Sequence, residues 1–188
     1  MSNKRAFDIA FVGLKPGVHE FNYEITDKFF EDFQQQDFTN SNVQVKLILD
    51  KKSNFMLLKF EIGGTIDTEC DRCLNPLSLQ LWDEFNITVK MVEDPELMNS
   101  NEEDPDVFYI SRGESHINTE NWIYEFINLS IPSQKYCVSN QDDEDDSSSC
   151  NADALKVLNS LKVEEKKEPI QKVNPIWKGL DKFKNLDN

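Results

Sequence analysis

Residues 43–62 read VQVKLILDKKSNFMLLKFEI, and the spacing of the apolar residues in this stretch decides the fold. Apolar side chains occupy every second position on both sides of a polar loop at 50–54, as Val43, Val45, Leu47 and Leu49 and then as Met56, Leu58, Phe60 and Ile62. A period of two places each set on one face of a β-strand. The stretch therefore predicts an antiparallel hairpin with one buried face.

The same alternation continues on both sides of the predicted hairpin. The odd positions from 77 to 91 are apolar except Asp83, which predicts one long strand or two strands joined by a bulge. Alternating apolar residues at 7–11 and 21–25 suggest two more strands. Together these patterns predict an α+β protein with a strongly curved, barrel-like antiparallel β-sheet.

Helical patterns surround and follow the strands. Thr26 can cap a short helix carrying Phe29, Phe30 and Phe33, and Asn118 or Thr119 can cap a helix that presents Trp122, Ile123, Phe126 and Ile127 and ends before Pro132. Asn151 can cap another with Leu155, Leu158 and Leu161, and Asn174-Pro175 opens a last one with Ile176, Trp177, Leu180 and Phe183. We expect a core domain over 1–132, an acidic cysteine-containing loop over 133–150, and a helical C-terminal extension with a flexible linker over 151–188.

The charge of the chain limits its partners. Its 188 residues include 20 Lys and Arg against 35 Asp and Glu, a net charge of −15, while 13 Phe and a 38% hydrophobic share still provide for a core. Residues 151–188 carry a net +2, which leaves −17 on residues 1–150; the acids concentrate at 93–106 and 142–146. Nucleic-acid binders usually present a basic face to the phosphates. The charge therefore disfavours direct binding to RNA.

The longest apolar run suggests neither a membrane span nor a signal peptide. Residues 9–14 fall far short of the roughly 20 residues that a spanning helix needs, and Asp8 interrupts the candidate signal segment. We therefore expect a cytoplasmic protein without a membrane partner. In that reducing compartment a C-x-x-C pair is more often a metal or redox site than a disulfide.

Four cysteines are the candidate metal ligands. Cys70 and Cys73 lie between two predicted strands, at a hairpin tip, where two thiolates three residues apart can hold one zinc ion. The other two ligands would have to be Cys137 and Cys150, whose twelve intervening residues are an irregular spacing for a zinc ribbon. Structural Zn²⁺ and reduced free cysteines both remain open, and the spacing favours the free cysteines.

The residue patterns do not favour an enzyme. A redox dithiol would need its first cysteine at the start of a helix, whereas Asn75-Pro76 is followed by strand alternation. The sequence contains no phosphate loop, Rossmann glycine pattern, nucleophile elbow or paired-histidine metalloprotease motif. The apolar face around Trp177 can dock on its own domain or on a partner.

Three short motifs, taken in order, resemble a known family. They are Cys70-x-Arg72-Cys73-Leu74-x-Pro76, Leu129-x-Ile131-Pro132 and Asn174-Pro175-x-Trp177-x-x-Leu180. Together they look like the YceD family, the large ribosomal RNA subunit accumulation proteins. The terminal motif departs from the family's D-P-R-W-x-x-L at Asn174 and Ile176, and the chain has only two cysteines after Pro132, where many members have more.

The resemblance implies a non-enzymatic ribosome biogenesis factor that supports accumulation of large-subunit ribosomal RNA. It marks Cys70, Arg72, Cys73, Pro132, Pro175, Trp177 and Leu180 as motif positions, of which we take Arg72, Trp177 and Leu180 as binding candidates. The acidic charge favours a basic ribosomal protein or assembly factor as partner over direct contact with ribosomal RNA. The alternatives are a zinc-stabilised RNA-binding module that uses Arg72 and the Lys-rich tail, and a thiol- or metal-dependent enzyme.

Overall fold

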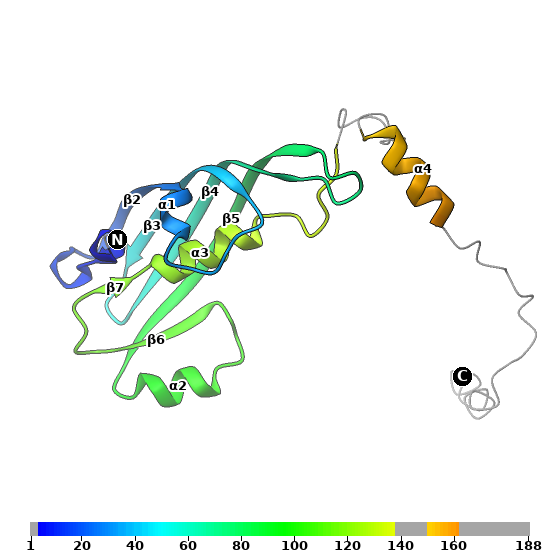
Figure 1. Cartoon of the computed structure of the whole chain (residues 1–188). Coiled ribbons are helices and arrows are strands. Elements are labelled where there is room, and N and C mark those ends of the chain that lie inside the picture. Colours follow the sequence, from blue (N-terminus) through cyan, green and yellow to red (C-terminus); the bar gives the residue numbers. More distant parts are fainter. Residues whose placement is uncertain (1–3, 138–149, 162–188) are drawn as a thin grey trace, which may run out of the picture. The chain divides into compact units, whose positions relative to one another are not determined.

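The structure, a computed structural model, describes residues 4–137 and 150–161. The chain divides into two compact units, Met1–Asn151 and Ala152–Asn188. The first unit contains the sheet and most of the helices (Figure 1). The helical elements among its described residues are the 3₁₀ turns η1 (Lys4–Phe7) and η2 (Phe11–Gly13) and the helices α1 (Asp27–Phe30), α2 (Pro95–Asn101) and α3 (Glu120–Leu129).

The large sheet has five strands in the order β2-β3-β4-β5-β6. These strands are β2 (Gly17–Thr26), β3 (Thr39–Lys51), β4 (Phe55–Glu69), β5 (Pro76–Val92) and β6 (Val107–Ser111). The first four pair antiparallel, and β6 pairs with β5 in parallel. A second, two-stranded sheet pairs β1 (Asp8–Ile9) with β7 (Ile117–Asn118). The predicted α+β class is thus confirmed.

The predicted hairpin at residues 43–62 is the centre of the sheet. Leu47 lies opposite Phe60 and Leu49 opposite Leu58, and all four side chains are buried. The apolar residues that alternate in the sequence are therefore the buried residues of β3 and β4. The 77–91 segment forms one continuous strand, β5, whose register with β4 is unbroken even at Asp83.

The predicted barrel-like closure is wrong, because the sheet is open. Strand β2 ends the order on one side and β6 ends it on the other. Strand β6 is short and pairs only with the last part of β5, over residues 88–92. The inner face of the sheet is covered by α1 and α3 instead of by a closing wall of strands (Figure 1).

The sequence predicts a strand over residues 7–11, but only Asp8 and Ile9 form one. Phe7 ends η1 and Phe11 begins η2, so the short β1 lies between two 3₁₀ turns. Phe7 and Phe11 are nevertheless buried, and the Phe7 ring stacks on Tyr23 of β2 with centroids 5.3 Å apart. Packing of these rings, rather than strand pairing, explains why the apolar residues alternate here.

The two helices over the sheet form where the sequence places them, although α1 ends at Phe30 and does not include Phe33. The cap of α1 differs from the predicted one, whereas Asn118 caps α3 as predicted. The Thr26 side chain makes no capping hydrogen bond. The Asp27 carboxylate instead accepts hydrogen bonds from the Ser41 hydroxyl and from the backbone N–H groups of Asn40 and Ser41, which hold the start of α1 against β3 and lower the pKa of Asp27. At α3, the Asn118 side chain accepts from the Glu120 N–H, and the Thr119 hydroxyl bonds the Phe7 carbonyl.

The centre of the core is formed by aromatic rings that pack between α3 and the middle of the sheet. The Phe126 ring lies parallel to Phe85 of β5, with centroids 4.4 Å apart, and meets the Phe60 ring of β4 at 5.1 Å. Ile123 and Ile127 of α3 are completely buried beside them. Burial of several large apolar side chains, each contributing roughly 1.5–3 kcal/mol, fixes the helix on the sheet.

The described part of the second unit is the helix α4 (Ala152–Leu161), at the position expected after Asn151. The predicted acidic loop at 142–146, and the predicted last helix with Trp177 and Leu180, lie outside the described residues. Among the residues that the structure describes, no helix is both long enough and apolar enough to cross a membrane.

Two adjacent glycines of β4 offer a sharp test of the fold. Gly64 has a positive φ of 147°, and a Cβ there would lie 2.7 Å from the Val43 Cα and still closer to the Asn42 carbonyl oxygen. We expect Gly64→Ala to lower the free energy of unfolding by about 2–3 kcal/mol, because it combines backbone strain with a clash against backbone. A Cβ added at Gly63 meets no atom within 4 Å, so Gly63→Ala should change the free energy of unfolding by less than about 0.5 kcal/mol. Equal urea midpoints for both variants would contradict this.

Candidate metal centre

The hairpin tip between β4 and β5 forms a tight turn that carries Cys70 and Cys73. The Cys70 N–H donates to the Asn75 carbonyl and the Leu74 N–H donates to the Cys70 carbonyl, each at 2.9 Å. Leu74 takes a left-handed conformation with φ of 58°, which closes the turn. Both cysteine side chains are buried in this turn, as the sequence predicts for a C-x-x-C knuckle.

The chain that follows α3 is fastened to this turn by the two residues between the cysteines. The Asp71 N–H donates to the Lys135 carbonyl at 2.8 Å, and the Lys135 N–H donates to the Asp71 carboxylate at 2.6 Å. The Arg72 guanidinium lies over the Tyr136 ring, 3.9 Å from its centroid. Because Tyr136 immediately precedes Cys137, these contacts deliver Cys137 to the hairpin tip.

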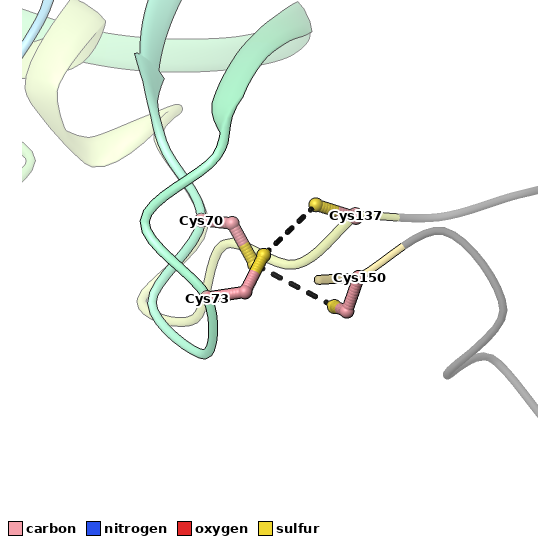
Figure 2. Close-up of side chains that lie close together, drawn as sticks. All are labelled: Cys70, Cys73, Cys137 and Cys150. Atoms are coloured by element: carbon pink, nitrogen blue, oxygen red, sulfur yellow. Dashed lines mark hydrogen bonds between the residues drawn. The ribbon is translucent and has the colours of Figure 1, made fainter. Parts of the chain in front are cut away.

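All four cysteine sulfurs gather at one point (Figure 2). The Sγ atoms of Cys70 and Cys150 are 3.9 Å apart, those of Cys73 and Cys137 are 3.6 Å apart, and all four lie within 4.8 Å of one another. A zinc ion about 2.3 Å from each sulfur of a tetrahedral Cys₄ site holds the sulfurs about 3.8 Å apart. The spacing of the sulfurs therefore fits a single tetrahedral ion.

The electrostatics of the four thiols also suit a cation. Burial raises the pKa of Cys70, but hydrogen bonds to its sulfur outweigh burial and bring that pKa to about 6. The donors are the backbone N–H groups of Arg72, Cys73 and Cys137 and the Cys137 thiol. Burial and the neighbouring thiols raise the pKa of Cys137 to about 12, and burial raises that of Cys150. Cys70 therefore favours the thiolate by itself, whereas Cys137 and Cys150 would favour it only beside a bound divalent cation.

The closed form of the site decides what chemistry it can perform. Each of the four cysteines is less than 9% exposed, and all four sulfurs point into the cluster. Structural zinc sites are filled by four protein ligands in this way, whereas catalytic sites keep one position open for water or substrate. Four buried sulfurs are therefore suited to holding the chain together and not to attacking a substrate.

The structure places most of the residues that the sequence singled out. It brings Cys70, Cys73, Cys137 and Cys150 together, although the spacing of the last two favoured free cysteines. Arg72, a binding candidate, contacts Tyr136 of its own unit. Sequence reasoning missed the positioning roles of Asp71, Lys135 and Tyr136, because no local pattern shows that residue 71 meets residue 135. The binding candidates Trp177 and Leu180 lie outside the described residues.

The fold and the site define a small α+β protein in which four buried cysteines bring the chain after α3 together with the tip of the β4–β5 hairpin. A family model described as "Large ribosomal RNA subunit accumulation protein YceD" matches residues 58–184. The chain belongs to the YceD family, as the three motifs indicated. Comparisons with the curated proteins and with solved structures found no match.

Proposed function

We propose that the protein is a non-enzymatic factor that supports accumulation of large-subunit ribosomal RNA, in the compartment where ribosomal subunits assemble. The observation that carries this proposal is the family match, which extends over residues 58–184 and includes all four cysteines of the centre. The family description refers to RNA accumulation and not to a reaction. The closed cysteine centre agrees with a structural role for the four sulfurs.

Contact with a protein, rather than with the RNA itself, is the mechanism that the charge supports best. The net charge of −15 repels phosphates, and Arg72, the basic residue of the cysteine motif, already contacts Tyr136. A basic ribosomal protein or assembly factor has the opposite charge, and opposite potentials speed association and select the partner. We therefore propose such a basic protein as the direct partner.

We also propose that the four cysteines hold a structural Zn²⁺ ion. The sulfur separations of 3.6 and 3.9 Å support it, because they match a tetrahedral Cys₄ site. The backbone N–H groups aimed at Cys70 support it as well, since such donors surround thiolate ligands. The ion would hold the segment after α3 against the hairpin tip, so that it acts in stability and not in chemistry.

The partner class is tested by binding of the purified full-length chain to basic large-subunit ribosomal proteins and to naked ribosomal RNA, each at 50 and 300 mM salt. We expect binding to at least one ribosomal protein, weakened about tenfold or more at the higher salt, and much weaker binding to RNA. Neutralising Asp142 to Asp146 should slow the association at low salt.

The opposite result would support a zinc-stabilised RNA-binding module. In that case RNA binds tightly with a steep salt dependence, no ribosomal protein binds, and Arg72→Ala weakens the RNA complex. A parallel experiment deletes the gene in the source organism and measures large-subunit RNA. Normal RNA levels in the deletion strain would refute the proposed function whatever the binding result.

A further inference from the structure

The outer face of the large sheet carries an exposed tryptophan. α1 and α3 pack on the inner face, so Trp82 of β5 projects on the side away from them. Its side chain is 79% exposed, the highest value of any large apolar residue that the structure describes. Tryptophan is mostly buried in folded proteins, and it is enriched among the residues that dominate binding interfaces.

Trp82 borders a hollow because the neighbouring residue in the sheet has no side chain. Gly63 of β4 lies directly opposite Trp82, and Gln44 of β3 lies opposite Gly63. A hollow of about 230 Å³ forms over this row of the sheet, lined on its polar and aromatic sides by Asn22, Gln44, Lys46, Glu61, Gly63 and Trp82. We call these six residues the Trp82 surface. The hollow has room for one large side chain against the indole ring.

The charges around the Trp82 surface favour a cationic side chain. Glu20, Glu24, Glu61 and Glu84 lie on this face near Trp82 together with Lys46 and Lys59, and these six residues carry a net charge of −2. The lysines make ion pairs of 2.9–3.0 Å with Glu20, Glu61 and Glu84. Such solvent-exposed pairs are weak and can exchange for an incoming cation at little cost.

We propose that the Trp82 surface is the docking site for an arginine side chain on an extended segment of a basic ribosomal protein. The guanidinium plane stacks on the indole and donates hydrogen bonds to the carboxylates and the Gln44 amide around it. Arginine suits the site better than lysine, because its planar group both stacks on aromatic rings and bonds carboxylates in pairs. The identity of the partner rests on the proposed function, whereas the arginine specificity rests on the surface alone.

Two other occupants fit the observations less well. A nucleic-acid base could stack on Trp82, but the carboxylates around it repel the phosphates that accompany a base. A second copy of the chain would bring two molecules of charge −15 together through an acidic face. A basic protein segment can both stack on the Trp82 ring and pair with the carboxylates around it.

The test uses the full-length chain and two labelled twelve-residue probe peptides, one of alternating Arg and Ser and the other of alternating Lys and Ser, with binding measured by fluorescence anisotropy. We expect the Arg peptide to bind more tightly than the Lys peptide. Trp82→Thr should weaken the Arg peptide about fivefold or more and the Lys peptide less than twofold. Gly63→Thr should have the same effect, because its side chain fills the hollow while Trp82 remains.

Matched controls separate the site from the general acidity of the chain. Val18→Thr removes another exposed apolar residue, 63% exposed, from the same sheet face and should leave both affinities unchanged. Glu61→Gln with Glu84→Gln should weaken the Arg peptide severalfold more than Glu31→Gln with Asp32→Asn, which remove the same charge elsewhere. Thermal melting confirms that each variant is folded.

Several results would overturn the inference. If Trp82→Thr and the unchanged chain bound the Arg peptide equally, the surface would not be an arginine site. If the unchanged chain formed a dimer that Trp82→Thr lost, the occupant would be a second copy of the chain. If Trp82→Thr lost RNA binding instead, the occupant would be a nucleic-acid base. A rise in peptide affinity on Trp177→Ser would assign the surface to the chain's own tail. If the variants behave as expected but the chain binds no ribosomal protein, the proposed partner is refuted and the arginine site stands. If ribosomal proteins bind equally to Trp82→Thr and to the unchanged chain, the proposed partner stands and its docking at the Trp82 surface is refuted.

Discussion

Cys70→Ser should abolish metal binding and lower the free energy of unfolding by roughly 3 kcal/mol or more. The unchanged chain, purified without chelator, should contain one zinc ion, because its four sulfurs lie within 4.8 Å of one another. Three thiolates hold zinc far more weakly than four, and the metal-binding energy is lost from folding. The two measurements are elemental analysis and thermal unfolding with and without chelator.

Leu74→Asn provides the matched control, since it changes the same turn at an exposed position without touching a sulfur. Asparagine tolerates the left-handed conformation of residue 74, so metal content and stability should be retained. Acidification should release the metal, because each ligand must be deprotonated to bind it. A metal-free chain that melts at one temperature with and without chelator would show instead that the four cysteines are free thiols, and iron in place of zinc would correct the identity of the ion.

Phe60→Ala should cost about 3–5 kcal/mol of unfolding free energy, a large fraction of the stability of a domain of this size. Phe60 is completely buried at the point where β4 meets α3, with its ring against Phe126 and Trp122. Alanine removes the ring and leaves a cavity between helix and sheet. Urea denaturation followed by circular dichroism measures the loss.

Phe55→Ala is the matched control, because it makes the same chemical change in the same strand at a side chain that is 37% exposed. We expect it to cost about 1 kcal/mol or less. If both variants lost the same free energy, the contact between β4 and α3 would not be the centre of the core. If neither lost any, the inner face of the sheet would not be the buried one.

Much of the fold could be predicted from the sequence because its signals are local. A period of two from Val43 to Ile62 specifies strands, and it also specifies which face is buried, since neighbouring side chains of a strand must point to opposite sides. The position of the C-x-x-C turn follows from the strands on either side of it. The start of α3 likewise follows from its apolar spacing and the residues at 118–119.

Only the tertiary structure decided whether the strands close into a barrel and which residues from distant parts of the sequence become neighbours. Whether a sheet forms a barrel depends on pairing between strands distant in the sequence, and here α1 and α3 cover the inner face while β2 and β6 remain the edges. The hollow beside Trp82 follows from its pairing with Gly63, nineteen positions earlier.

The four-cysteine centre was likewise predictable in part from the sequence and in part only from the tertiary structure. The sequence by itself determined the family and the turn that carries Cys70 and Cys73. Ligand spacing could not place Cys137 and Cys150, because a twelve-residue connection is long enough to reach many positions at little extra entropic cost. The contacts of Asp71 with Lys135 and of Arg72 with Tyr136 bring Cys137 to the hairpin tip. Such contacts join residues more than sixty positions apart, so only the folded chain can reveal them.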